Sequence, residues 1–134
     1  SMTDAEYEAQ KARINALIEE WAVPLLIGFN VTHEFVRDAE HFTTDGQPAL
    51  ETVANCKTTW RYCRASISWN MPRVAEQDDE DLEWTMVHEC CHVLVNEARC
   101  PENEHGDVDW LSHEERVCSQ LATAILRVRD KVKA

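Results

Sequence analysis

The feature that most constrains this chain is a pair of histidines four residues apart with a glutamate after the first. Residues 88–92 read HECCH and lie in a long apolar-periodic stretch, which predicts a helix that ends at about residue 97. Acidic residues at 78–81 precede this stretch, and negative charge is favoured at a helix N-terminus. Positions four apart share one helical face, so the sequence predicts that both imidazoles can reach the same cation.

The HExxH pattern is typical of a zinc site in which His88 and His92 are ligands and Glu89 is the general base. Zinc accepts imidazole nitrogen readily, and catalytic zinc sites use three protein ligands plus water. Glu89 is one position further round the helix, where its carboxylate can take a proton from a water whose pKa zinc lowers to about 7. We therefore predict a Zn2+ cofactor, with Glu89 as the catalytic residue.

A third zinc ligand is implied by a resemblance to a known family. The segments LEWTMVHECCHVLVNEA (82–98) and HEERVCSQLATAIL (113–126) resemble the short gluzincin metallopeptidases, which include minimal thermolysin-like domains and similar small proteins often encoded by phages. The resemblance covers roughly residues 58–128 and implies a zincin-like fold, with a glutamate on a following helix as third ligand. It implies Glu115, because the residues after it fit the family pattern better than those after Glu114. Ser119 stands where the family often has Asp or Asn to steady a ligand histidine.

Two other assignments of the third ligand remain open from the sequence. Ser112-x-x-Glu115 also matches a capping box, which would make Glu115 structural and favour Glu114 as the ligand. His105-Gly106, followed by Trp110, resembles the SprT-like proteases, whose third ligand is a histidine in a His-Gly pair. We favour Glu115 over Glu114, and either of them over His105.

The apolar patterns predict an α+β domain that spans residues 1–134. We expect a small antiparallel three-stranded sheet with an N-terminal helix, the HExxH helix and a C-terminal glutamate helix. The expected elements are a helix over 4–21, an extended segment over 25–36, a loop over 37–50 with an Asp45-Gly46 turn, two strands within 52–70, and a last helix over about 109–131.

Two of these elements carry more detailed predictions. The strand Arg64–Trp69 resembles the edge strand above the catalytic helix of these families, where an extended substrate can add by backbone hydrogen bonds; an ordinary amphipathic edge strand is the other interpretation. The last helix is expected to bury an apolar stripe made of Val117, Leu121, Ile125 and Val128.

Composition limits the partners of the protein. The net charge of −12 disfavours direct binding of nucleic acid through a basic patch. No secretory signal precedes the domain, and no apolar run approaches the roughly 20 residues that a membrane helix needs. We therefore expect a cytoplasmic protein, without membrane association, whose six cysteines are free thiols and whose Cys90 and Cys91 are packing residues.

Together these features predict a zinc metallopeptidase that acts on a peptide or protein substrate. Tyr62, His105 and His113 are candidates to stabilise the oxyanion. A zinc-stabilised interaction protein without catalytic activity is the main alternative, and hydrolysis of a non-peptide amide is another. A structural zinc should have four protein ligands, whereas a catalytic one should have three and a water.

Overall fold

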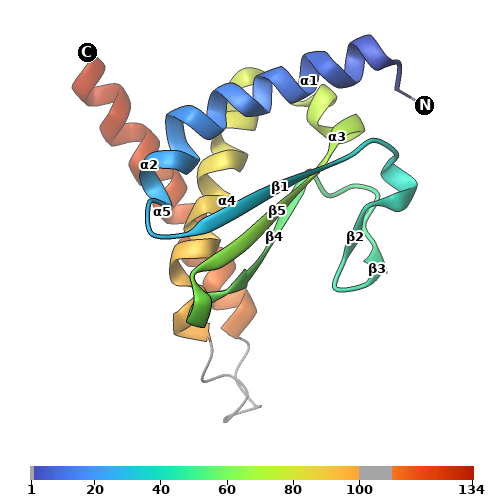
Figure 1. Cartoon of the computed structure of the whole chain (residues 1–134). Helices are drawn as coiled ribbons and strands as arrows, with labels where there is room; N and C mark the ends of the chain where they lie inside the picture. Colours follow the sequence, from blue (N-terminus) through green and yellow to red (C-terminus); the bar gives the residue numbers. More distant parts are fainter. Residues whose placement is uncertain (1, 100–109) are drawn as a thin grey trace.

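A three-stranded sheet forms the centre of the protein, shown here as a computed structural model that describes residues 2–99 and 110–134 (Figure 1). Its strands are β1 (Asn30–Val36), β4 (Ala54–Thr59) and β5 (Arg64–Asn70), in the spatial order β1-β5-β4. β5 pairs antiparallel with β4 but parallel with β1. The predicted α+β class is confirmed, whereas the prediction of a wholly antiparallel sheet is wrong. The long connection over residues 37–53 brings the chain back before β4 begins, so β1 joins the sheet by a crossover and not by a hairpin.

The position of β5 corrects a second prediction. β5 lies between the other strands, so Arg64–Trp69 is not an edge strand. Its inward side chains Ala65, Ile67 and Trp69 are at most 6% exposed, as expected for the central strand of a small sheet. The strand that lies at the sheet edge and packs on the HExxH helix is β4.

The N-terminal helix is longer than its apolar pattern indicated. α1 (Asp4–Leu17) begins with a capping box between Thr3 and Glu6, and then continues through a π-helical turn, Ile18–Ala22, into the short helix α2 (Val23–Leu25). Pro24 does not end the helix, because it is the second residue of α2, which follows the π-helical turn directly. The predicted extended segment therefore begins at Asn30 and not at residue 25.

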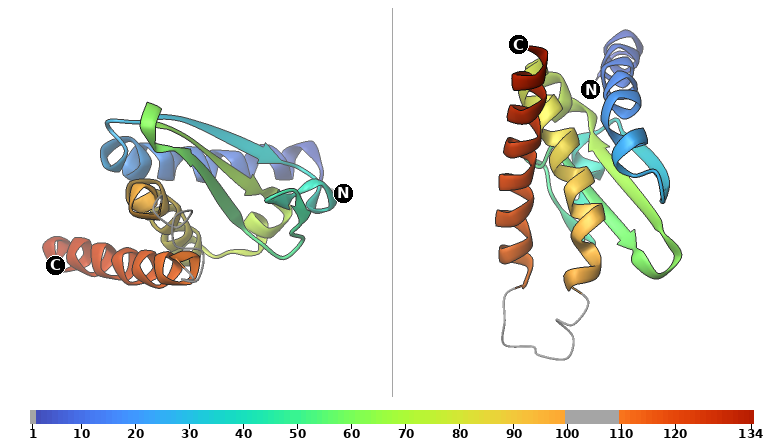
Figure 2. Two further views of the ribbon diagram at one scale, coloured as in Figure 1. Left: turned by 90° about the horizontal axis from the view of Figure 1, so that it is seen from below. Right: turned by 90° about the vertical axis from the view of Figure 1, so that its left-hand side faces the viewer.

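Two long helices pack behind the sheet in successive layers. α4 (Asp79–Arg99) carries the HExxH motif, and α5 (Trp110–Lys133) follows it. Figure 2 shows α4 between the sheet and α5. The Asp78 carboxylate accepts a hydrogen bond from the backbone N–H of Asp81 at 2.8 Å, which caps the start of α4. A short helix that the sequence analysis missed, α3 (Met71–Glu76), begins with Pro72 in its first turn.

The face of α5 that packs on α4 differs from the predicted stripe. Val117, Leu121 and Val128 are 37–63% exposed, so the prediction that they are buried is wrong. The buried apolar residues of α5 are the small side chains Cys118 and Ala122, at the spacing of one helical turn. Small side chains at a helix–helix contact allow the two axes to approach closely, and this brings the acidic start of α5 against the motif on α4.

The connection between β1 and β4 is folded into short elements. A 3-10 turn (Ala39–His41) is followed by the two-residue strands β2 (Thr43–Thr44) and β3 (Gln47–Pro48), and another 3-10 turn (Trp60–Tyr62, η3) joins β4 to β5. Asp45 and Gly46 join β2 to β3 with φ angles of 52° and 78°, so the predicted turn is confirmed. Within the described residues, no helix has both the length and the apolar character that crossing a membrane requires.

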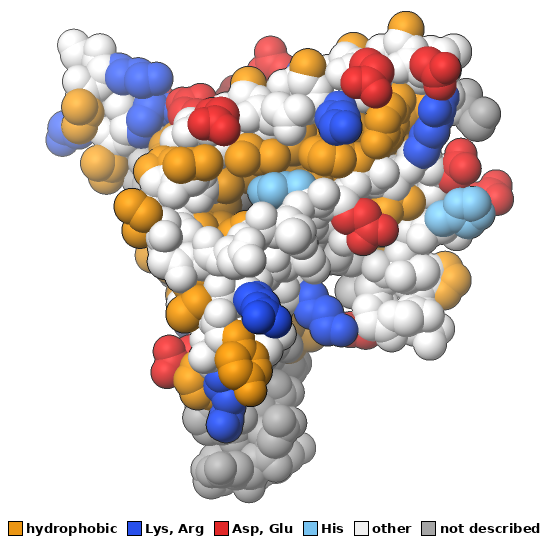
Figure 3. Space-filling model, viewed as in Figure 1, with side chains coloured by type: hydrophobic (Ala, Val, Ile, Leu, Met, Phe, Trp, Pro, Cys, Tyr) orange, Lys and Arg blue, Asp and Glu red, His pale blue; other side chains and the backbone are white. Residues whose placement is uncertain are grey.

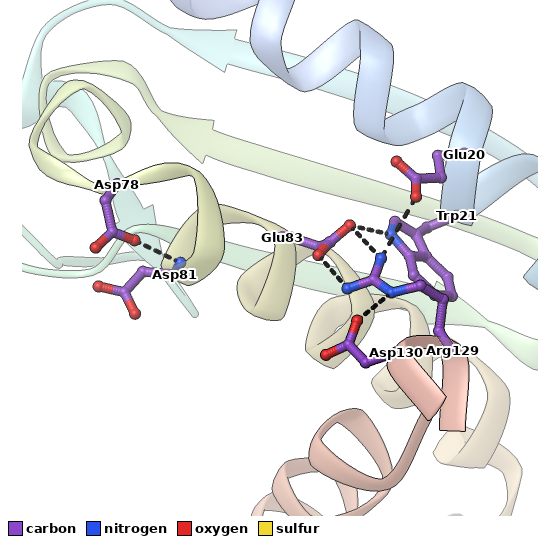
Figure 4. A network of polar contacts seen from close by, with 7 residues as sticks. All are labelled: Glu20, Trp21, Asp78, Asp81, Glu83, Arg129 and Asp130. Atoms are coloured by element: carbon purple, nitrogen blue, oxygen red, sulfur yellow. Dashed lines mark hydrogen bonds and ion pairs between the residues drawn. The ribbon is translucent and has the colours of Figure 1, made fainter. Parts of the chain in front are cut away.

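A polar clamp holds the far end of the three helices together (Figure 4). Arg129 on α5 donates two hydrogen bonds to Glu83 on α4, at 2.8 and 2.7 Å, and Trp21 donates a third through its indole N–H at 2.9 Å. The paired geometry of the Arg129 guanidinium and the Glu83 carboxylate makes this a strong charge-assisted contact. It fixes the C-terminal part of α5 against the N-terminal part of α4.

Candidate metal centre

The two motif histidines converge as the sequence predicts. His88 and His92 project from adjacent turns of α4, and their Nε2 atoms are 2.9 Å apart. The side chains are almost buried, with 9% and 7% of their surface exposed. Burial lowers the pKa of His88, and the neighbouring His92 lowers it further, while Glu115 acts in the opposite direction. Burial therefore favours the neutral imidazole, which is the form that binds a metal.

Glu115 on α5 reaches the same point from the opposite side. Its carboxylate oxygens lie 2.9 Å from His92 Nε2 and 3.3 Å from His88 Nε2. For metal–ligand bonds of 2.0–2.1 Å, tetrahedral coordination places ligand atoms about 3.3 Å from one another. The three side chains therefore fit the size and donor set of a zinc site with two imidazoles and one carboxylate.

Glu114 contacts the other nitrogen of His92. Its Oε1 lies 2.8 Å from His92 Nδ1, and the Glu114 side chain is buried. A carboxylate at this nitrogen fixes the tautomer and ring orientation of a metal-binding histidine. The structure thus gives the two adjacent glutamates different positions, with Glu115 beside both Nε2 atoms and Glu114 behind one ring. Glu114 therefore takes the place beside a motif histidine that the family pattern gives to an Asp or Asn at the position of Ser119.

A second group of potential donors lies behind His92, and it fits a metal less well. It consists of His92 Nδ1, Glu114 and Cys118. Burial is the main cause that raises the pKa of the Cys118 thiol to about 12, so in the metal-free protein the thiol stays protonated. In this group Glu114 contacts His92 Nδ1, whereas the cluster that contains Glu115 brings a carboxylate beside the Nε2 atoms of both histidines.

The capping-box interpretation of Glu115 does not match the helix. α5 already begins at Trp110, so Ser112 lies inside the helix and is not its N-cap. The competing candidate His105 lies outside the described residues.

Glu89 lies beside the proposed ligands and faces the edge strand. It is 8% exposed, and its carboxylate accepts a hydrogen bond from the thiol of Cys56 on β4. Burial is the main cause that raises the pKa of Glu89 to about 7, although His92 and the Cys56 thiol act in the opposite direction. A carboxylate whose pKa lies near neutral is well matched to accept and return a proton at physiological pH.

The carboxylates of the site and His92 line one pocket, whereas His88 does not line it. It has a volume of about 420 Å³, and its walls include five successive residues of β4, 54–58, together with the inner residues Glu89, His92, Glu114 and Glu115. The β2–β3 turn forms part of its opposite rim. The pocket therefore places Glu89, His92 and Glu115 next to an edge strand. Tyr62 is 70% exposed and does not line this pocket, and neither does His113.

Sequence reasoning missed two contributors to the site. Cys56 was taken as an ordinary reduced thiol, and Glu114 was considered only as an alternative ligand. Nothing local in the sequence indicates the contact between Cys56 and Glu89, since the two residues belong to different elements. The family pattern places the residue that steadies a ligand histidine at the position of Ser119, whereas the carboxylate beside His92 is that of Glu114, and its position depends on how α5 packs. The five cysteines in the described residues are free thiols, as predicted.

A helix with the HExxH motif, beside an edge strand and a carboxylate from the following helix, is an arrangement typical of metallopeptidases. A profile of the SprT-like family matches residues 29–130, and the chain therefore belongs to this family. No curated protein and no solved structure shows significant similarity to the chain. The match includes β1 and nearly all of α5. It is therefore longer than the segment 58–128 on which the sequence analysis based its resemblance.

Proposed function

We propose that the chain is a zinc-dependent peptidase in which His88, His92 and Glu115 hold the metal and Glu89 is the general base. The observation that carries this proposal is the convergence of His88 Nε2, His92 Nε2 and the Glu115 carboxylate within 3.3 Å of one another. Membership of the SprT-like family supports the metallopeptidase class. That membership also keeps His105 as the alternative third ligand.

The residues of the pocket suggest how each would contribute. Zinc at this position would supply a Lewis acid and lower the pKa of water to about 7. Glu89 would accept a proton from the attacking water and deliver it to the leaving amine, and its raised pKa suits both steps. Glu114 would hold the His92 ring in the metal-binding orientation. These assignments describe a metal-assisted hydrolysis of an amide bond.

The edge strand β4 supports a polypeptide substrate. Five consecutive residues of β4 line the pocket that contains Glu89, and an edge strand presents unpaired backbone N–H and C=O groups. An extended peptide would pair with β4 by backbone hydrogen bonds, which fix its position without demanding a particular sequence. This proposal moves the substrate-binding role from Arg64–Trp69 to β4.

Metal analysis of four proteins tests the ligand assignment. We expect wild type and Glu114→Ala to purify with zinc, Glu115→Ala to lose it, and His105→Ala to keep it. Loss of zinc in His105→Ala alone would replace Glu115 by His105, and absence of zinc from wild type after reconstitution would overturn the proposal.

Turnover of an unfolded protein such as casein tests the role of Glu89. Glu89→Gln should keep zinc and the fold but lose activity by about 10²–10⁴-fold. Glu80→Gln, an exposed substitution on the same helix, is the matched control and should keep activity. Full activity of Glu89→Gln would exclude it as the base. Zinc-loaded wild type that cleaves no polypeptide would favour the interaction-protein or non-peptide hydrolase alternatives.

A further inference from the structure

The end of the β4–β5 hairpin concentrates positive charge on an otherwise acidic protein. The chain has 25 acidic and 13 basic residues, yet the stretch from 52 to 75 contains four basic residues and no acidic one. Three of these cations, Lys57, Arg61 and Arg64, are exposed around the turn. Figure 3 shows blue side chains next to an orange patch in the lower part of the face in view, where Figure 1 places the β4–β5 turn. We call this surface, with Trp60 and Tyr62, the hairpin tip.

The cations of the hairpin tip are not neutralised within the described part of the chain. No acidic side chain there forms an ion pair with Lys57, Arg61 or Arg64, whereas other arginines, such as Arg73 and Arg129, pair with glutamates. As far as residues 2–99 and 110–134 are concerned, these three cations therefore form a local positive surface that can attract an external anion.

The two arginines are held in place by aromatic rings. The Arg61 guanidinium lies 5.1 Å from the centre of the Trp60 ring, and that of Arg64 lies 5.8 Å from the Tyr62 ring. A guanidinium that lies over a ring keeps its N–H groups directed outward, where they can bind a carboxylate with two parallel hydrogen bonds. The stacking also limits the conformational freedom that each arginine would lose on binding.

The hairpin tip is continuous with the pocket of the metal centre. Lys57 lines that pocket together with Glu89 and His92. Lys57 and Arg64 also line a depression of about 230 Å³ on the outer face of the sheet. A polypeptide that follows β4 out of the pocket would therefore pass directly over these cations.

We propose that the hairpin tip is a secondary binding site for an acidic segment of the polypeptide substrate. The proposal rests on the function proposed above, because it is the pocket that selects a polypeptide. A nucleic acid is disfavoured as the occupant for two reasons. Its continuous charge would meet repulsion from a protein of net charge −12, and the arginines already occupy ring faces on which bases would stack.

Two charge-matched variants test the proposal. Each of them changes the net charge from −12 to −15, because it replaces three cations by glutamine. The test variant removes the cations of the hairpin tip: Lys57→Gln, Arg61→Gln and Arg64→Gln. The control variant removes three exposed cations near the C-terminus of α5, away from the hairpin tip: Arg127→Gln, Lys131→Gln and Lys133→Gln. Equal net charge isolates the effect of position from that of the overall field.

Binding is measured by fluorescence anisotropy, which does not require catalysis. The probes are a labelled peptide of alternating glutamate and glycine, its glutamine counterpart, and a single-stranded oligonucleotide of equal charge. The acidic peptide should bind wild type and control alike, and the test variant about tenfold more weakly. Binding should be lost at about 0.5 M salt. Equal binding of the acidic peptide to both variants would overturn the proposal, as would tighter binding of the oligonucleotide.

A cleavage assay separates failure of this proposal from failure of the proposed function. An acidic segment added to a cleaved substrate should lower KM for wild type and control but not for the test variant, with kcat unchanged. Cleavage with no effect of the segment would overturn the hairpin tip alone. Tip-dependent binding without any cleavage would overturn the peptidase and leave an acidic-peptide-binding surface.

Discussion

Replacing Glu114 by alanine is the substitution that best separates the roles of the two adjacent glutamates. Glu114 lies 2.8 Å from His92 Nδ1 with only 6% of its side chain exposed, while Glu115 lies beside both Nε2 atoms with 54% exposed. Without Glu114, the His92 ring loses the group that fixes its tautomer, but the three proposed ligands remain. We therefore expect weaker zinc binding and not its abolition.

The size of the effect follows from the geometry. Loss of a carboxylate that orients a ligand histidine lowers metal affinity about 10–100-fold, which corresponds to about 1.4–2.7 kcal/mol. The metal-free protein should also lose about 1–3 kcal/mol in free energy of unfolding, because a buried imidazole N–H is left without its acceptor. Glu115→Ala should show the reverse pattern, with loss of zinc but little change in the stability of the metal-free protein.

Competition with a chromophoric zinc chelator measures the affinities, and urea denaturation of the chelated proteins measures the stabilities. Glu114→Gln is the control, since its side-chain carbonyl can still accept from His92 Nδ1, and its affinity should fall between those of wild type and Glu114→Ala. If Glu114→Ala released zinc completely while Glu115→Ala kept wild-type affinity, the roles assigned from the structure would be exchanged.

Two further predictions concern the helical clamp and the general base. Arg129 and Trp21 lower the pKa of Glu83, so the ion pair stabilises the fold fully above the ordinary carboxyl pKa of about 4.5, and this stability is lost as the pH falls through the depressed value. At pH 7, Glu83→Gln should lower the free energy of unfolding by about 1–3 kcal/mol, and at pH 3.5 by less. Urea titrations measure both values, with the exposed substitution Glu8→Gln as control. A loss of stability that does not depend on pH would contradict the charge-based explanation. Cys56→Ala removes a donor that lowers the pKa of Glu89, so the acid limb of the kcat/KM profile should move up by about half to one pH unit, while Cys56→Ser should keep it near wild type. Coincident limbs in the three proteins would show that the thiol does not position the base.

The sequence by itself determined the local features of the site. Residues four apart on a helix lie on one face in any protein, so the pairing of His88 with His92 needed only the period of the α-helix. The Asp45-Gly46 turn was likewise decided locally, by the positive φ angles that this dipeptide tolerates. The sequence also indicated the α+β class through the two periodicities of its apolar residues.

The tertiary structure decided everything that depends on contacts between elements. The apolar pattern of α5 pointed to Val117 and Leu121, but close packing against α4 selected the smaller Cys118 and Ala122. Because Cys118 and Ala122 face α4, Glu114 is directed to His92 Nδ1 and Glu115 to the Nε2 atoms of both histidines. Likewise, strand propensity located β5 but not its central place, because strand order depends on pairing between distant segments. Periodicity reports which face of an element is apolar, whereas only packing determines which residues meet across the gap.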